Sequence, residues 1–274
     1  MDADGSDLAR VTNEAAQGRW AAHPTWSPDG TEIAYTVIWH RDGPHRSEIY
    51  VTDATGKATR PLTTTPDGKS SWQASWSPDG KQIAFVSDRD ENPDLYTMSI
   101  DGGGLRRLTH TAGEDKHSWN PWWSPDGRQI AFNSNSSGND EIYVIDLNTS
   151  QVRALTATAG EGKESWTPAW SPSGKEIAFA SNRGGRDEIY VMDADGSNPR
   201  RLNVQTVGRP TWSPDGRKLI FQARVESNRE AVYVVNLDGT GLARLTRGDC
   251  SARHPRWCCP NLTGTLVRRS AQAQ

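Results

Sequence analysis

Apolar residues occur along the chain in short runs. A run of the Ile-Ala-aromatic type recurs five times, and each copy is followed, after a polar segment, by a run of the Ile-Tyr-Val type. The first pair of runs consists of Ile33–Tyr35 and Ile49–Val51. Short runs of β-branched and aromatic residues, bounded by Gly, Pro, Asn and Asp, are typical of β-strands. The pattern therefore predicts an all-β protein with no helix.

A five-residue motif, Trp-Ser-Pro-Asp-Gly, precedes each Ile-Ala-aromatic run. Copies begin 42 to 50 residues apart, at Trp26, Trp76, Trp123, Trp170, Trp212 and, in degenerate form, Trp257. The fourth copy has Ser173 in place of Asp. Pro fixes φ, Asp bonds its own backbone and Gly accepts a positive φ, so the motif predicts a tight turn between two strands. A period in the forties built from short strands is typical of the four-stranded blade of a β-propeller.

These repeats resemble those of the TolB-type propeller, a family of WD-like repeats, and the resemblance extends over essentially the whole sequence. It implies a six-bladed ring of four-stranded antiparallel blades. We therefore predict one β-propeller over residues 1–274, with complete blades starting near residues 23, 73, 120, 167 and 209. Residues 1–12 and 254–270 are expected to form the last blade together, which would hide the strand edges that an open sheet exposes.

Charge and composition exclude several classes of function. The formal net charge is -3 and the pI is about 6.1, so no basic field is available to attract nucleic acid. No apolar stretch reaches the length of a membrane-spanning helix, and the polar N-terminus has no signal-peptide pattern. Three clustered cysteines, Cys250, Cys258 and Cys259, do not make a disulfide framework. We expect a monomer without membrane insertion, metal or cofactor, and a cytoplasmic location if the sequence is complete.

One end of the predicted channel carries a set of tryptophans. Three of them lie four residues before the motif Trp and one lies six residues before it; these rim tryptophans are Trp72, Trp119, Trp166 and Trp20. Clustered exposed tryptophans are typical of a surface that binds a partner. The alternative is that the side chains fold inward and brace the loops.

A second set lies three residues before the motif Trp. The residue there is polar but different in every blade; we call these the channel positions, and they are His23, Gln73, Asn120, Thr167, Arg209 and His254. Such variation indicates a lining adapted to one ligand, and Arg209 could pair with a carboxylate or phosphate. The alternative is that strand ends near solvent are polar without further purpose.

The TolB resemblance implies a non-catalytic binding domain that captures a protein or peptide partner at the channel mouth, and it implies a periplasmic location. Two alternatives remain open. Similar blades occur in metal-dependent oligogalacturonate lyases, for which His23, Gln73 and His254 are the comparable residues. A similar propeller also gates the hydrolase domain of prolyl oligopeptidase relatives, so this protein could be an accessory domain. No catalytic residue is predicted.

Overall fold

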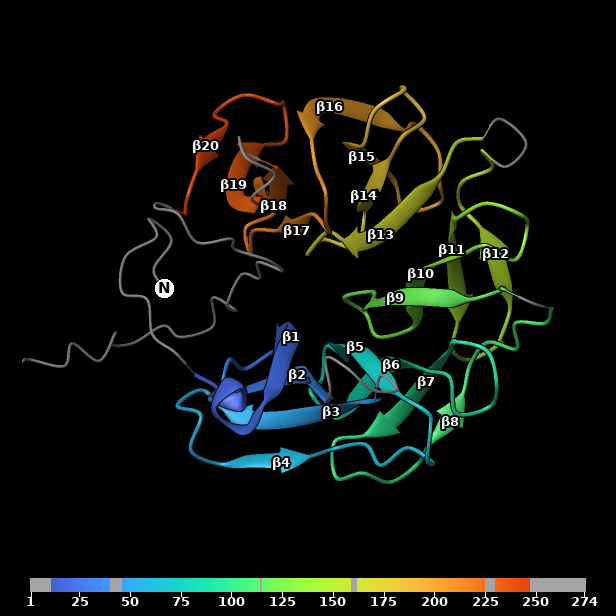
Figure 1. The fold of residues 1–274 in the computed structure, drawn as a ribbon. Coiled ribbons are helices and arrows are strands. Elements are labelled where there is room, and N and C mark those ends of the chain that lie inside the picture. Colours follow the sequence, from blue (N-terminus) through green and yellow to red (C-terminus); the bar gives the residue numbers. More distant parts are fainter. Residues whose placement is uncertain (1–10, 40–45, 114, 159–161, 225–229, 247–274) are drawn as a thin grey trace, which may run out of the picture.

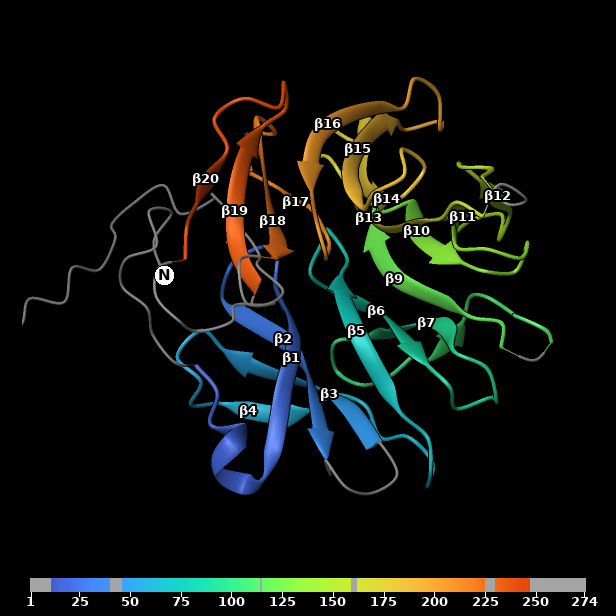
Figure 2. The ribbon, with the colours of Figure 1, turned by 45° about the horizontal axis from the view of Figure 1, so that its top comes forward.

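Five separate antiparallel sheets make up the described part of the molecule. The computed structural model describes residues 11–39, 46–113, 115–158, 162–224 and 230–246. Every sheet has four strands that follow one another in the sequence. Figures 1 and 2 show the sheets arranged in sequence order around a common centre, with the first strand of each sheet nearest that centre. The described residues therefore form the blades of a β-propeller.

The strand bounds repeat from blade to blade. The inner and second strands are β1 (Arg19–Trp26) and β2 (Glu32–Trp39), β5 (Ser71–Trp76) and β6 (Gln82–Ser87), β9 (Ser118–Trp123) and β10 (Gln129–Ser134), β13 (Ser165–Trp170) and β14 (Glu176–Ser181), and β17 (Thr211–Trp212) and β18 (Lys218–Arg224). The third and outer strands are β3 (Arg46–Asp53) and β4 (Thr59–Pro61), β7 (Asp94–Ser99) and β8 (Arg106–Arg107), β11 (Glu141–Asp146) and β12 (Val152–Ala154), β15 (Glu188–Asp193) and β16 (Arg200–Gln205), and β19 (Glu230–Asn236) and β20 (Ala243–Arg244).

The middle strands of each blade hold the core. In the second blade Ile83, Ala84 and Phe85 are fully buried, because β6 is covered on both faces by neighbouring blades. Phe85 stacks on Tyr96 of β7, with 5.8 Å between the ring centroids. The same stacked pair recurs in the next three blades, as Phe132–Tyr143, Phe179–Tyr190 and Phe221–Tyr233. Such cross-strand aromatic pairs stabilise a sheet beyond the area that they bury.

The motif turn is held by its own side chains, as the sequence predicts. The Ser77 hydroxyl donates to Asp79 Oδ1 at 2.6 Å, and Asp79 Oδ1 accepts the Lys81 amide at 3.0 Å. These hydrogen bonds hold the pKa of Asp79 below its usual value. In the fourth blade Ser173 replaces the aspartate, and both hydrogen bonds are longer. The Ser171 and Ser173 hydroxyls are 3.1 Å apart, and the Lys175 amide donates to the Ser173 hydroxyl at 3.4 Å. The motif aspartates therefore serve the turns.

The motif tryptophans are predicted to pack between blades, and this is confirmed for the four in the second to fifth blades, whereas Trp26 of the first blade is half-buried. Trp76, Trp123, Trp170 and Trp212 are 5 to 7% exposed. Three of them also donate the indole N–H to a carbonyl of the preceding blade, with Trp76 bonded to Thr25, Trp123 to Ser75 and Trp212 to Ala169 at 2.9 to 3.2 Å. Trp170 Nε1 has no hydrogen-bond partner among the described residues. Each of the second to fifth blades is thus joined to its predecessor by one large buried ring.

The predicted number of blades is wrong. The described residues form five four-stranded sheets and no sixth. Residues 11–12, expected in the last blade, are not in a strand, and they lead into a 3-10 helix, η1 (Glu14–Gln17), that the sequence did not predict. The other residues of that blade, 1–10 and 254–270, lie outside the described residues. The repeat is a poor guide there because Cys258, Cys259 and Pro260 stand where the intact motif has the Ser, Pro and Asp that build the turn.

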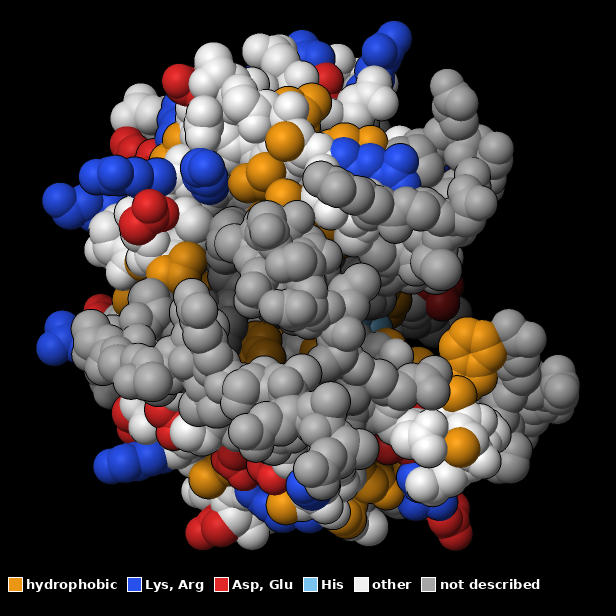
Figure 3. Space-filling view, turned by 90° about the vertical axis from the view of Figure 1, so that its left-hand side faces the viewer, with side chains coloured by type: hydrophobic (Ala, Val, Ile, Leu, Met, Phe, Trp, Pro, Cys, Tyr) orange, Lys and Arg blue, Asp and Glu red, His pale blue; other side chains and the backbone are white. Residues whose placement is uncertain are grey.

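Charges on the surface are mixed in sign. Figure 3 shows Lys and Arg side chains interspersed with Asp and Glu side chains around one side of the molecule. This agrees with the small net charge of -3. Within the described ranges, no helix has the length and apolar character needed to cross a membrane.

Candidate functional site

The first four channel positions lie at a bulge in the inner strand of each blade. In the second blade Trp72 pairs with Val86 and Ser75 pairs with Ala84, so two residues of β5 stand opposite the single residue Phe85. The same shift occurs in β1, β9 and β13. At each bulge the channel residue has a left-handed backbone, with φ of 49° to 57° for His23, Gln73, Asn120 and Thr167. A bulge bends the strand and turns a side chain away from the regular alternation.

Proline explains why the inner strands break at this point. It follows the channel residue as Pro24, Pro121 and Pro168 in three of these four blades. Proline has no N–H for the strand ladder and is confined within sheets to edges and bulges. A left-handed backbone costs a β-branched residue such as Thr167 more than it costs Asn. Strain of this kind is concentrated at functional sites.

At three of these bulges a polar side chain of the preceding blade accepts the backbone N–H of the channel residue. The Gln73 amide donates to Thr36 Oγ1 at 3.2 Å, and the Asn120 amide donates to Gln73 Oε1 at 3.0 Å. The Thr167 amide makes a longer bond of 3.5 Å with Asn133 Oδ1. An unpaired buried N–H would be costly, so these side chains fix the bulges in place.

One cavity of about 290 Å³ brings the channel positions together. Its wall includes His23, Gln73, Asn120, Thr167 and Arg209, which come from five different blades. We call this space the channel cavity. Trp119 and Trp166 of the rim also line it. The repeat predicts this meeting, because equivalent residues of successive blades lie at the same height around the centre.

Arg209 reaches across the centre of the molecule. It precedes β17 in the fifth blade, and its NH2 group donates to Asn120 Oδ1 of the third blade at 2.8 Å. Its guanidinium also lies 5.3 Å from the ring centroid of Trp122. A hydrogen bond and a cation–π contact hold the planar group in one orientation. The cavity thus contains a positioned cation.

Sequence reasoning missed two polar residues of the cavity, Asn133 and Asp140. Asp140 Oδ1 accepts Asn133 Nδ2 at 3.0 Å and lies 3.2 Å from Nε2 of His117. The His117 ring packs against Trp119, with 4.5 Å between the centroids. A signal for Asn133 exists, since it is a buried polar residue directly after the buried apolar run 130–132 of β10. Asp140 lies just before β11 and shows no such pattern.

The rim tryptophans differ in exposure. Trp20 is 49% exposed and Trp119 is 37% exposed. Trp72 and Trp166 are half-buried, and Trp72 packs against the core between the second and third blades. The rim thus divides into two exposed rings and two half-buried rings, of which Trp72 also braces the fold. His254, the remaining channel position, lies outside the described residues.

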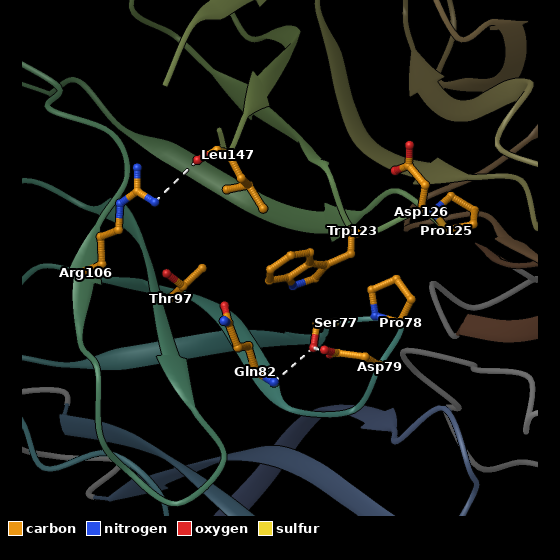
Figure 4. A pocket seen from close by; sticks show the side chains of 11 residues that line it. Ser77, Pro78, Asp79, Gln82, Thr97, Arg106, Trp123, Pro125, Asp126 and Leu147 are labelled. Atoms are coloured by element: carbon orange, nitrogen blue, oxygen red, sulfur yellow. Dashed lines mark hydrogen bonds between the residues drawn. The ribbon is translucent and has the colours of Figure 1, made fainter. Parts of the chain in front are cut away.

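Larger cavities occur between neighbouring blades, away from the channel positions. Figure 4 shows one of about 570 Å³, in which Arg106 donates to the carbonyl of Leu147 beside the buried ring of Trp123. A cavity of about 560 Å³ lies at the equivalent place one blade further, beside Arg153 and Trp170. Equivalent cavities recur because neighbouring blades move apart with distance from the centre of the ring. We therefore place the candidate site in the channel cavity, where the residues vary.

Comparison with known proteins gives both sequence relatives and fold relatives. Over 86 residues the protein is 36% identical to the Tol-Pal system protein TolB of Anaeromyxobacter dehalogenans, a match that covers 31% of this sequence and 18% of that protein. The crystal structure of TolB from Acinetobacter baumannii superposes with a TM-score of 0.73 at 24% identity, covering 88% of this protein and 58% of that one. The present protein thus spans less than two thirds of these relatives.

Enzymes share the fold at lower identity. A puromycin-hydrolyzing peptidase of Mycobacterium tuberculosis gives a TM-score of 0.62 at 19% identity, covering 84% of this protein and 38% of that one. An oligogalacturonate lyase in complex with manganese gives 0.57 at 16% identity, covering 80% and 66%. At these identities the likeness shows the fold alone.

A family model decides the classification. The model described as the TolB beta propeller domain matches residues 6–120 and 112–208. These ranges contain the first four channel positions and all four rim tryptophans. Because the match extends over well more than half of the sequence, this protein belongs to the TolB beta propeller domain family.

Proposed function

We propose that this propeller is a binding domain that captures a protein or peptide partner at the mouth of the channel, without a catalytic step. One observation carries the proposal: four strained bulges and Arg209 direct a different polar side chain from each blade into one cavity. Repeated strain that the turns and core do not require favours a site maintained for a ligand.

The exposed rim tryptophans support a macromolecular partner. Trp20 and Trp119 present 49% and 37% of their surface to solvent. Tryptophan is enriched among the residues that dominate binding energy at protein interfaces. A cavity of about 290 Å³ is small for a whole ligand of drug size, but it can admit one side chain of a partner that rests on the rim.

The class of partner is proposed from the names of the relatives. The curated relative is named as a Tol-Pal system protein, and the match covers 18% of its length. We extend this context to the present protein as a proposal: the partner is a protein of a Tol-Pal system, and the location is periplasmic. Fractionation of the source cells would test the location, and recovery in the cytosolic fraction would contradict it.

A matched pair of variants tests the binding face. Trp119→Ala removes an exposed ring at the rim, whereas Leu105→Ala removes an exposed apolar side chain, 48% exposed, beside an outer strand. Wild type and both variants, checked for fold by circular dichroism, would serve as bait in extract of the source organism. Partners should be lost with Trp119→Ala and retained with Leu105→Ala. Equal recovery by all three baits would reject the rim as the binding face.

A lyase-like enzyme is a second candidate, because His23 and Gln73 line the same cavity. His254, which that function also needs, lies outside the described residues. Titration with Mn²⁺ by calorimetry tests this candidate. Saturable binding that is lost in the His23→Ala variant would favour the enzyme, and identical heats for wild type and variant would count against it.

A further inference from the structure

Two formally charged side chains, Asp140 and Arg209, line the channel cavity. Asp140 is contacted by polar N–H groups of the scaffold, with Asn133 Nδ2 at 3.0 Å and His117 Nε2 at 3.2 Å. The NH2 group of Arg209 donates to the amide oxygen of Asn120, and its guanidinium lies against Trp122. A carboxylate carries a full negative charge and can accept two parallel N–H bonds from a guanidinium, which a single amide oxygen cannot do. An incoming carboxylate can therefore compete with Asn120 Oδ1 for the NH2 group of Arg209.

Thr167 supplies a second donor in the same cavity. Its hydroxyl oxygen is buried and has no hydrogen-bond partner among the described residues. A buried hydroxyl without a partner costs about 1–3 kcal/mol, and a ligand oxygen would remove that cost. Thr167 keeps this position on a left-handed backbone with φ of 52°. It comes from the blade next to that of Arg209, and both residues line the cavity wall.

We infer that the channel cavity receives a carboxylate group of the partner, held by the Arg209 guanidinium and the Thr167 hydroxyl. This inference rests on the proposed function, since the partner is the protein or peptide bound at the rim. The carboxylate belongs to an Asp or Glu side chain or to the C-terminus of the partner. A carboxylate has two oxygens and can accept from both donors at once.

The number of donors favours a carboxylate over a phosphate. A carboxylate has two oxygens to place, whereas a phosphate group has three, and the Asp140 carboxylate in the same wall offers no donor to a further oxygen. The cavity wall also includes the Trp119 and Trp166 side chains, which suit the apolar part of an inserted side chain.

Selection of peptides provides the test, because it does not require the partner to be identified first. Random linear peptides would be selected on the full, immobilised protein. The winners would be resynthesised with each Asp or Glu replaced by its amide and, separately, with an amidated C-terminus. Dissociation constants would be measured for wild type, Arg209→Gln, Thr167→Val, Trp119→Ala and Arg217→Gln. Arg217 is an exposed arginine of a motif turn outside the cavity, so Arg217→Gln is the matched control.

We expect removal of one particular carboxylate to weaken binding to wild type at least tenfold. Arg209→Gln and Thr167→Val should bind the carboxylate peptide more weakly and should no longer discriminate it from its amide, whereas Arg217→Gln should behave as wild type. Sensitivity to side-chain replacement identifies an acidic residue, and sensitivity to amidation identifies a C-terminus. Thr167→Val retains shape and charge, so it keeps the test valid if Arg209→Gln melts at a lower temperature.

Other outcomes separate this inference from the proposed function. If peptides require Trp119 but bind their neutral analogues equally well, the carboxylate inference fails and the binding function stands. If a phosphopeptide binds more tightly than the carboxylate peptide, the inference also fails. If no peptide is selected, or if none requires Trp119, both the inference and the proposed function are overturned.

Discussion

Two buried tryptophans at equivalent positions differ in one hydrogen bond, and this difference predicts a difference in stability. Trp123 Nε1 donates to the Ser75 carbonyl at 3.2 Å, whereas Trp170 Nε1 has no partner among the described residues. Their exposed fractions are nearly the same, at 7% and 5%. Replacing each with Phe removes the same atoms from similar surroundings. We expect Trp123→Phe to lower the free energy of unfolding more than Trp170→Phe does.

The size of the difference follows from the hydrogen bonding of the two indole N–H groups. Conversion of indole to phenyl should cost about 1–3 kcal/mol at either site, because the smaller ring leaves a cavity in the core. A neutral intramolecular hydrogen bond contributes about 1 kcal/mol net, and Trp170→Phe also removes a buried N–H whose missing partner costs about 1–3 kcal/mol. Trp123→Phe should therefore be about 2–4 kcal/mol more destabilising than Trp170→Phe. For a protein of this length each kcal/mol corresponds to a further fall in melting temperature of about 2–4 °C.

Urea unfolding followed by circular dichroism measures both free energies, and calorimetry gives the melting temperatures. The comparison requires equal m-values, because a changed m-value would indicate a different denatured state. A third variant, Trp212→Phe, also loses an indole hydrogen bond, of 2.9 Å, and should behave like Trp123→Phe. If Trp170→Phe is as destabilising as the other two, the reasoning from the hydrogen bond is refuted.

Two further predictions concern the irregular residues of the fourth blade. Ser173→Asp restores the motif turn and should raise stability by about 0.5–2 kcal/mol at pH 7, as consensus substitutions commonly do. The Ser171 hydroxyl should lower the pKa of the new carboxyl, as Ser124 lowers the pKa of Asp126. The gain in stability is therefore present above the unfolded pKa and is lost as pH falls through the lower folded pKa. An equal gain in melting temperature at pH 3 and pH 7 would contradict this prediction. Thr167→Gly relieves a left-handed backbone and should raise the melting temperature while weakening peptide binding; tighter binding by this variant would contradict a binding role.

Much of the fold was predictable because the repeat specifies it many times over. The Ile-Ala-aromatic and Ile-Tyr-Val runs form the second and third strands of each blade, as expected. The number of blades was predicted wrongly, because the sixth blade depended on a copy in which Cys258, Cys259 and Pro260 replace the turn-forming residues. Repetition predicts structure only where each copy keeps the residues that build its turn.

The candidate site was predictable as a set of residues but not as a geometry. The channel positions that the structure describes line one cavity, as their common place in the repeat suggests. The left-handed backbone of the first four was not predicted, although Pro24, Pro121 and Pro168 already mark a break in the inner strands. Asn133 and Asp140 join the cavity from the second strand and from a loop, so a search along the inner strands alone could not find them.

The division between constant and variable residues explains why this fold suits binding. The constant Ser, Asp and Trp of the motif direct their hydrogen bonds into turns and neighbouring blades, as Ser77, Asp79 and Trp76 do, so they have little capacity left for a ligand. The first four channel positions lie at bulges, where a side chain can change without disturbing the ladder of the other three strands. A left-handed backbone costs a residue such as Thr167 about 1–2 kcal/mol. The free energy gained from the large core between the blades offsets that cost. The strained positions are therefore available to recognise a ligand.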